Sequence, residues 1–381
     1  MSSETRQECL EKTRPRYQGA GRKYKKIILD EFCATGGYNR KYAIDLLNGK
    51  TAKGGGRRGR PARYGHKEHS VLERIWLIAT RPCSKRLKAM LMTWLPFYEQ
   101  EHGQLDLTTR TNLLRISKNS IDRLLRPTRK RYGTHGRSGT RPGTQLLHQI
   151  PIKTSHWNIG EPGFMQADTV AHGGLSMEGD FVYSLTFTDV FSGWTENRAT
   201  WNKGADGVLS QIEDIEQELP FVIRGFHSDN GSEFMNHHLY RYYAKRSEPV
   251  SMTRGRPHHG NDSAHVEQKN WSHVRLLLGY QRIEDQKLIP TINDLYRAWA
   301  LFNNFFCPNL KLVEKTKVGS RYQKKYDIPK TPYQRLMESE HFNEFQKTHL
   351  TERFCNMNPF KLKKQIDYKQ HQILNSLRSG D

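Results

Sequence analysis

Three acidic residues in three separate segments set the strongest condition on how this chain folds. Asp168 lies in FMQADTV, Asp229 in HSDNGSEF and Glu267 in NDSAHVEQKN. The flanks are otherwise apolar or turn-forming, so each carboxylate borders a folded core. Two carboxylates about 4 Å apart repel by roughly 4 kcal/mol at an effective dielectric near 20. Because a divalent cation removes that repulsion, the three segments predict a site for Mg²⁺ or Mn²⁺, which suit oxygen ligands.

The region around these residues predicts a layered α/β domain. We expect strands at 164–172, 181–192, 194–201, 221–226 and 249–253, and helices at 204–218, 232–246 and 262–279. Gly173, Gly174 and Gly179 favour a tight connection between the first two strands, as in an antiparallel meander. Three strands followed by alternating helices and strands are typical of helices packed on a sheet.

Residues 160–305 resemble the catalytic core of retroviral integrases and of the bacterial insertion-sequence transposases built on it. That family carries its acidic residues in the order Asp, Asp, Glu. Here 60 residues separate Asp168 from Asp229, and 37 separate Asp229 from Glu267. The flanks TFTDVFSGW, SDNGSEF and RPHHGNDSAHVEQKN also fit the family.

The resemblance implies a ribonuclease-H-like fold and a DDE polynucleotidyl transferase, a transposase or integrase active in DNA recombination. It implies that Asp168, Asp229 and Glu267 are catalytic and hold two Mg²⁺ (or Mn²⁺) ions. These would activate water to cut one DNA strand and then activate the freed 3′-hydroxyl for joining. The implied partners are the element's terminal repeats, target DNA and further copies of the chain. Two alternatives stay open: a transposase-derived DNA-binding repressor, and a nuclease that cuts without joining.

Three neighbours are expected to orient the acidic ligands: His227, Asn230 and Asn270. Asn270 follows Glu267 by three residues, so the two share one helix face. Glu233, the closest rival carboxylate, is expected to begin the next helix. The inward face of the helix that carries Glu267 is expected to comprise Ala264, Trp271, Val274 and Leu278.

This chain departs from the family at two points. Many insertion-sequence relatives carry Lys or Arg seven residues beyond the glutamate, where this chain has Val274. Lys269 and Arg275 are the nearest basic residues, and we expect them to contact DNA. The N-terminal His/Cys zinc module of retroviral integrases has no counterpart in the spacings here.

Basic residues are concentrated in the first part of the chain. The formal net charge is +22, and residues 1–150 hold 32 Lys and Arg against 12 Asp and Glu. The remaining residues are nearly neutral. This asymmetry indicates an anionic polymer as partner, and double-stranded DNA fits that description.

Two helical segments are candidates for helix-turn-helix DNA binding. In the module 1–50, residues 23–48 read as helix, glycine turn and helix, with Arg40 and Lys41 opening the second helix. A recognition helix meets DNA near its N-terminus. In the module 66–126, Arg123 and Arg126 point outward from the second helix of a similar pair. The alternatives are an ordinary helical hairpin for the first and a packed module that only presents charge for the second.

The remaining segments connect or follow these modules. Residues 51–65 form a basic linker that resembles an AT-hook, in which Arg57, Arg58 and Arg60 would enter a narrow minor groove. The alternative is a tether that contacts phosphates without specificity. We expect a second basic linker at 127–156, the catalytic core at 157–305, and a C-terminal arm with a short, mainly helical tail at 306–381.

Cysteine usage and hydropathy indicate the compartment. The five cysteines are scattered, odd in number and without a C-x-x-C motif, which predicts reduced thiols. No run of 18 apolar residues occurs, so no membrane span is expected. The N-terminus is polar and lacks a signal-peptide pattern. A cytoplasmic, nucleoid-associated bacterial protein is therefore expected.

Overall fold

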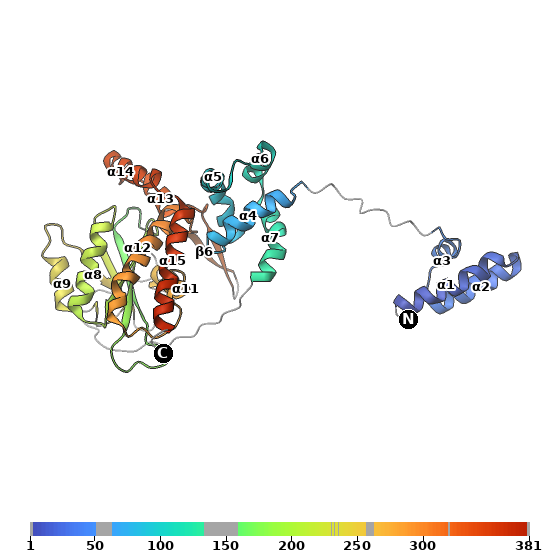
Figure 1. Ribbon diagram of the computed structural model, residues 1–381, viewed down its shortest axis with the longest axis horizontal. Coiled ribbons are helices and arrows are strands. Elements are labelled where there is room, and N and C mark those ends of the chain that lie inside the picture. The colour runs from blue at the N-terminus through green and yellow to red at the C-terminus, as the bar shows by residue number, and fades with distance from the viewer. Residues whose placement is uncertain are drawn as a thin grey trace. The chain divides into compact units, whose positions relative to one another are not determined.

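The computed structural model describes residues 3–50, 63–132, 159–229, 231, 233–234, 236–256, 263–318 and 321–378. The chain divides into two compact units, Met1–Arg63 and Tyr64–Asp381 (Figure 1). The expected contacts of Arg57, Arg58, Arg60 and Asn230 lie outside the described residues.

The first unit is a small helical module. It comprises α1 (Ser3–Gly19), α2 (Arg22–Gly36) and α3 (Arg40–Leu47). Gly37 ends α2 with a φ of 66°, a conformation that glycine adopts without strain. Asn39 caps α3, since its side chain accepts a hydrogen bond from the Lys41 N–H at 3.0 Å. The expected helix, turn and helix are present, whereas α1 was not predicted because its segment has few apolar residues.

The second unit begins with four helices. They are α4 (His66–Ile78), α5 (Ser84–His102), α6 (Leu107–Arg115) and α7 (Lys118–Tyr132). Asp106 caps α6 by accepting from the Thr109 N–H at 2.9 Å. The buried Trp94 of α5 donates from its indole N–H to the Phe306 carbonyl at 3.0 Å and packs on Phe302. These four helices therefore share a core with the α/β region.

A mixed sheet forms the centre of this unit in the described residues. Its strands are β1 (Phe164–Ala171), β2 (Val182–Asp189), β3 (Thr195–Trp201), β4 (Gly225–Ser228) and β5 (Ser251–Arg254). The order is β3-β2-β1-β4-β5. The pairs β1–β2 and β2–β3 are antiparallel, whereas β1–β4 and β4–β5 are parallel. This arrangement fits the ribonuclease-H-like fold that the resemblance implied.

Helices flank the sheet (Figure 1). They are α8 (Ala205–Glu218), α9 (His237–Ala244), α10 (Ala264–Lys269), the π-helix η2 (Asn270–Arg275), α11 (Leu276–Leu278), the 3-10 helix η3 (Gln286–Leu288) and α12 (Ile289–Phe306). The expected strand at 221–226 is wrong in extent, because β4 begins only at Gly225. Phe221 and Ile223 are buried but do not lie in a strand. The apolar residues at the start of this segment therefore indicate burial and not strand structure.

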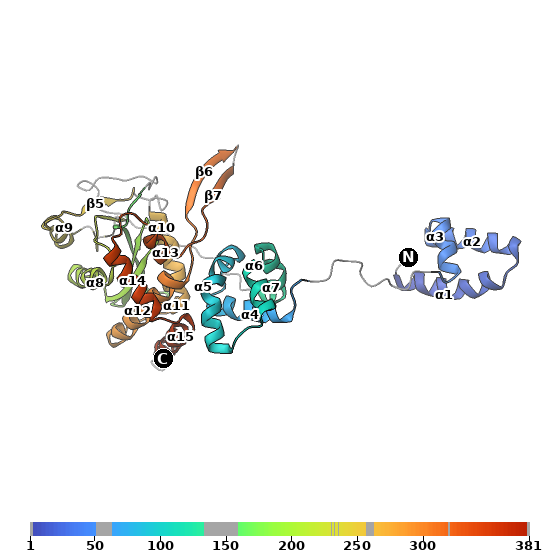
Figure 2. The ribbon, with the colours of Figure 1, turned by 90° about the horizontal axis from the view of Figure 1, so that it is seen from above.

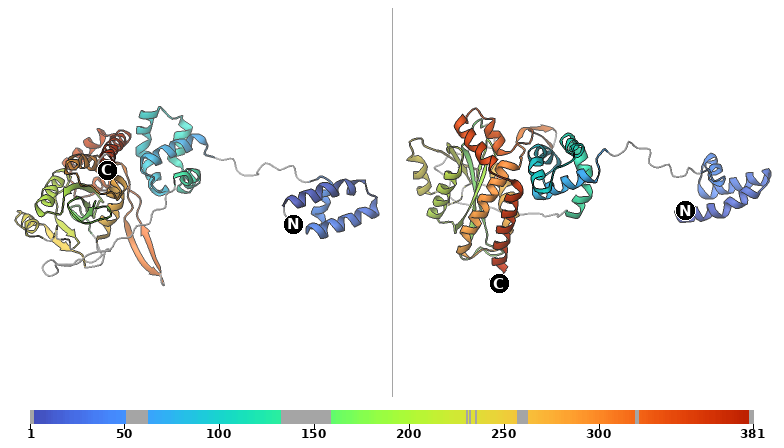
Figure 3. Two further views of the ribbon diagram at one scale, coloured as in Figure 1. Left: turned by 60° about the horizontal axis from the view of Figure 1, so that its bottom comes forward. Right: turned by 45° about the horizontal axis from the view of Figure 1, so that its top comes forward.

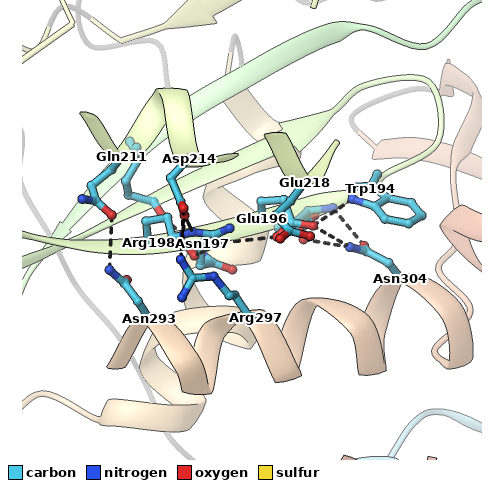
Figure 4. A network of polar contacts seen from close by, with 12 residues as sticks. Trp194, Glu196, Asn197, Arg198, Gln211, Asp214, Glu218, Asn293, Arg297 and Asn304 are labelled. Atoms are coloured by element: carbon cyan, nitrogen blue, oxygen red, sulfur yellow. Dashed lines mark hydrogen bonds and ion pairs between the residues drawn. The ribbon is translucent and has the colours of Figure 1, made fainter. Parts of the chain in front are cut away.

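Helix α12 covers the outer edge of β3. The Asn293 side chain accepts from the Ala199 N–H at 2.6 Å and donates to its carbonyl at 3.4 Å. The Asn304 side chain accepts from the Thr195 N–H at 2.9 Å and donates to its carbonyl at 3.0 Å. Figure 4 shows both asparagines reaching from the helix to the strand. The two amides therefore occupy backbone groups that an open edge would expose to pairing with another chain.

The C-terminal segment is more ordered than the expected arm and short tail. It comprises β6 (Leu312–Val318), β7 (Arg321–Tyr326), α13 (Pro332–Met337), α14 (Glu344–Cys355) and α15 (Pro359–Arg378). Strands β6 and β7 form an antiparallel hairpin of their own. Helix α15 lies along α12 (Figure 3), and its Phe360 packs on Trp94 of α5. Within the described ranges, every helix is too short or too polar to traverse a lipid bilayer.

Candidate active site

Asp168 and Asp229 are neighbours across two parallel strands. Ala167 of β1 is paired with Ser228 of β4, and an aspartate directly follows each of these two residues in the sequence. Adjacent strands lie about 4.8 Å apart. Asp168 is half-buried in the strand, whereas Asp229 is exposed just beyond the end of β4. The fold therefore brings together two acidic residues that are separated by 60 residues in the sequence.

A buried glutamine attaches the helix of Glu267 to the same strand. The Gln166 side-chain oxygen accepts hydrogen bonds from the N–H groups of His265 at 3.1 Å and Val266 at 3.3 Å. Gln166 precedes Asp168 by two residues, so both project from one face of β1. This tether fixes the first turn of α10, which carries the exposed Glu267. Sequence reasoning missed Gln166, although its alternation with Asp168 was a usable signal.

Asn270 holds the Asp168 carboxylate from the other side. Its amide donates to Asp168 Oδ2 at 2.6 Å, and the Thr169 N–H donates to Oδ1 at 2.8 Å. Asn270 Oδ1 is buried and has no hydrogen-bond partner among the described residues. Asn270 begins the π-helix η2, a rare element that is frequent at functional sites. Asn270 therefore lies where a residue that orients Asp168 must lie.

Burial and neighbouring carboxylates raise the pKa values of all three acidic residues. Burial, then the charge of Asp229 and to a smaller degree that of Glu267, raises the pKa of Asp168 to about 7, against the lowering effect of its two hydrogen bonds. Partial loss of water and the charge of Glu233 raise the pKa of Asp229. Loss of water and the charge of Asp229 raise the pKa of Glu267. All three groups therefore resist ionisation in the absence of a cation.

The chemistry of these side chains suits a hard divalent cation. The donors are carboxylate oxygens, and their mutual repulsion is what such an ion relieves. As the side chains stand, no three His, Cys, Asp or Glu residues in the described part of the chain are grouped closely enough to hold a metal ion. The set fits Mg²⁺ by donor type and by charge.

Glu233 supports the loop that carries Asp229. It is buried and accepts from the Thr169 hydroxyl at 2.6 Å and from the Lys203 ammonium at 2.9 Å. Burial raises its pKa, but the charge of Lys203 and the two hydrogen bonds outweigh this and hold the pKa below its usual value. A Cβ added at Gly231 would meet Glu233 Oε2 at 2.7 Å. The Glu233 carboxylate therefore lies directly beneath Gly231, two residues after Asp229. Glu233 does not begin the next helix as expected, because α9 starts only at His237.

Replacing Glu233 by Ala is expected to lower the free energy of unfolding by about 1–3 kcal/mol. The change leaves the Thr169 hydroxyl without its acceptor and removes hydrogen bonds to a buried charge. Urea unfolding of the metal-free protein measures the effect. Glu213→Ala is the matched control, because Glu213 is exposed on α8, and it should change stability by less than about 0.5 kcal/mol. Equal stabilities of the two variants would show that the Glu233 contacts contribute nothing.

The other residues expected near the site lie in varied surroundings. His227 is buried in β4, and its Nδ1 lies 2.9 Å from the Thr253 hydroxyl of β5. Lys269 is half-buried, and burial followed by the charge of Arg86 lowers its pKa to about 8. Arg275 donates to the Ala171 carbonyl at 3.0 Å and stacks over Tyr280. Lys269 and Arg275 are both partly buried. A side chain that contacts DNA from this helix would be more exposed than either of them.

The expected inward face of the helix is partly wrong. Val274 and Leu278 are fully buried, whereas Trp271 is 59% exposed. The expectation assumed a regular α-helix from 262 to 279. The π-helical turn adds a residue per turn and rotates the residues near its start away from the positions that a 3.6-residue period assigns.

The basic residues of the helical modules are accessible. Arg40 and Lys41 are exposed at the start of α3, and Arg40 forms an ion pair with Asp30 of α2. Arg123 and Arg126 are exposed on α7, and Arg123 also donates to the Ser120 hydroxyl at 3.3 Å. These four residues remain candidates for DNA contact.

The strand order and the flanking helices fit a ribonuclease-H-like fold. The chain is 37% identical over 340 residues to "Uncharacterized protein y4rM" of Sinorhizobium fredii, a match that covers 88% of this chain and 96% of that protein. The chain therefore belongs to the same family as y4rM. No protein-family model matches the sequence. Among solved structures, the catalytic core domain of BIV integrase is similar at a TM-score of 0.31 and 20% identity, covering 47% of this chain and 96% of that one.

Proposed function

We propose that this protein is a DNA transposase that binds the terminal repeats of its insertion sequence and catalyses metal-dependent strand cleavage and strand transfer. The observation that carries the proposal is the position of Asp168 in β1 beside Asp229, which directly follows the adjacent parallel strand β4. Glu267 lies on a helix that is tied to β1 through Gln166. The charges of Asp229 and Glu267 act on the Asp168 carboxylate. Carboxylates that repel one another at the centre of a sheet are typical ligands of a divalent metal ion.

Asp168, Asp229 and Glu267 would hold the Mg²⁺ or Mn²⁺ ions. Two such ions, when bound, supply an activated oxygen nucleophile and stabilise the leaving oxygen of a phosphodiester. Asn270 keeps the Asp168 carboxylate oriented through the 2.6 Å hydrogen bond to Oδ2. Glu233 and Lys203 keep the Asp229 loop in place through their ion pair. His227, with Asn230, would support the same loop from β4.

The basic modules would supply DNA binding. Arg40 and Lys41 of the first unit, with Arg123 and Arg126 of α7, are exposed cations on separate helices. Arg57, Arg58 and Arg60 would add minor-groove contacts from the linker. Two DNA-binding modules on one chain raise the combined affinity for a long site. Pairing of two element ends requires more than one copy of the chain, so we propose a homo-oligomer on bacterial nucleoid DNA.

A strand-transfer assay tests this function. Purified protein is incubated with duplex oligonucleotides that carry the ends of the element and with supercoiled target DNA, in Mg²⁺, in Mn²⁺ or in EDTA. We expect nicking at the element end and joining to the target only with metal. Cutting without joining would identify a nuclease. Specific binding without any cutting in either metal would identify a repressor and end the transposase proposal.

A further inference from the structure

The β6–β7 hairpin, residues 312–326, is a ribbon that extends from the body of its unit (Figure 2). We call it the β-arm. Every described side chain in it is exposed, including Leu312 at 46%, Val313 at 64% and Tyr326 at 44%. A two-stranded hairpin without a covered face is at best marginally stable in water. The β-arm therefore contributes nothing to the hydrophobic core, and its surface is available for a binding partner.

The β-arm is strongly basic. Its sequence holds five basic residues and one acidic residue, Glu314, for a net charge of +4. Lys324 and Lys325 of β7 are both exposed. A polyanion that binds along the ribbon would neutralise this charge.

The root of the β-arm is fixed on the catalytic sheet. The Lys311 N–H donates to the Asp327 carboxylate at 2.8 Å, and the Asp327 N–H donates back to the Lys311 carbonyl at 3.0 Å. Arg335 of α13 forms an ion pair with Asp327 at 2.6 Å. The Lys311 ammonium donates to the carbonyl of Phe191, two residues beyond the end of β2. A ribbon anchored at both strands and tied to the sheet keeps a defined direction relative to Asp168.

We propose that the β-arm enters a groove of the duplex that the active site acts on and holds it through phosphate contacts. The inference rests on the proposed function. The major groove is about 12 Å wide and admits a two-stranded β-ribbon. A strand of seven residues, the length of β6, extends about 23 Å, enough to cross that groove. A second copy of this chain fits less well as the partner, because its formal net charge of +22 repels the ribbon.

The test neutralises two exposed lysines of the β-arm in the full-length chain, Lys324→Gln with Lys325→Gln. Affinity for an element-end duplex is measured across a salt series. Each phosphate contact contributes about −0.9 to the slope of log K against log salt, so we expect the slope to become shallower by about 2. Metal-dependent cutting should need more DNA for half-saturation, with an unchanged rate at saturation.

The matched control is Lys287→Gln with Lys361→Gln, which makes the same charge change at two exposed lysines outside the β-arm. It should leave the salt slope unchanged. An unchanged slope in the β-arm variant with wild-type cutting would overturn the inference and leave the transposase proposal standing. A reduced salt slope in the β-arm variant, together with no cutting by the wild type, would support DNA binding by the β-arm and contradict the transposase proposal. A change in oligomer mass by light scattering without DNA, at constant slope, would assign the β-arm to a second copy instead.

Discussion

The Asp168→Asn variant is expected to lose DNA cutting and joining while becoming more stable than the wild type at neutral pH. An amide of the same shape has no charge with which to hold a divalent cation between Asp229 and Glu267. We expect the rates of both reactions to fall by at least about 10³-fold, equivalent to roughly 4 kcal/mol of barrier. DNA affinity in EDTA should stay unchanged, because the basic modules and the β-arm are untouched.

The gain in stability follows from the pKa of Asp168. Its value is 3.8 without the protein environment and about 7 in the folded protein. The folded state therefore binds this proton more tightly than the unfolded state, and wild-type stability falls as the pH rises from about 4 to about 7. The Asn variant lacks this titration. Its advantage should be absent near pH 4 and reach on the order of 1–3 kcal/mol above pH 7, allowing for screening at a half-buried group.

Urea unfolding in EDTA at about pH 4.5 and about pH 8 measures this difference. Asp180→Asn is the control, since Asp180 is exposed in the turn before β2, and it should change neither stability nor activity. Mg²⁺ should then stabilise the wild type at pH 8 but not the Asp168→Asn variant, because a ligand that binds only the folded state adds stability. Equal stability of both proteins at both pH values would mean that Asp168 ionises without hindrance and feels no neighbouring charge.

The sequence contained enough to predict the strand and helix order of the α/β region. Strands β1 to β3 follow from local apolar patterns and from glycines between them, and Asp168 falls inside β1 as expected. The contacts that orient the acidic residues could not be predicted from the sequence. Glu233 meets Thr169 across 64 positions and Gln166 meets His265 across 99. Such pairs depend on the register between β1, β4 and α10, which no local pattern specifies.

The β6–β7 hairpin had a local signal in the sequence, whereas the exposure of Trp271 did not. The two residues between β6 and β7 are Gly319 and Ser320, a pair typical of a tight hairpin connection. The expectation of an extended arm overlooked it. The exposure of Trp271 had no such signal, because a π-turn depends on how η2 packs on β1 and not on composition.

A second large effect is expected in the core, from replacing Arg198 by Met. The Arg198 side chain is fully buried in β3 and forms an ion pair with Asp214 of α8. Its Nη1 donates to the Asn197 carbonyl at 2.8 Å and lies 3.4 Å from the buried Glu196 carboxylate (Figure 4). Removing one partner of a buried ion pair leaves the other charge without compensation. We expect the free energy of unfolding to fall by about 3–5 kcal/mol.

The pH dependence identifies Glu196 as the origin of that loss. Burial already raises the pKa of Glu196 to about 7, although Arg198 lowers it, so loss of Arg198 raises it further. A carboxyl group with a raised folded pKa loses stability as the pH rises. The deficit of Arg198→Met should therefore be larger at about pH 8 than at about pH 5 in urea unfolding. In the double variant Arg198→Met with Glu196→Gln, the deficit should be smaller and nearly independent of pH.

Arg297→Met is the control that separates burial from ion pairing. Arg297 of α12 also contacts Asp214, at 3.0 Å, but its side chain is 40% exposed. Exposed ion pairs contribute about 0–1 kcal/mol, so this variant should be close to the wild type. Equal losses from Arg198→Met and Arg297→Met would show that the Asp214 contact, and not the buried Glu196 charge, determines stability. Because the network joins β3 to α8 and lies apart from Asp168, the double variant should keep metal-dependent cutting at temperatures where it is folded.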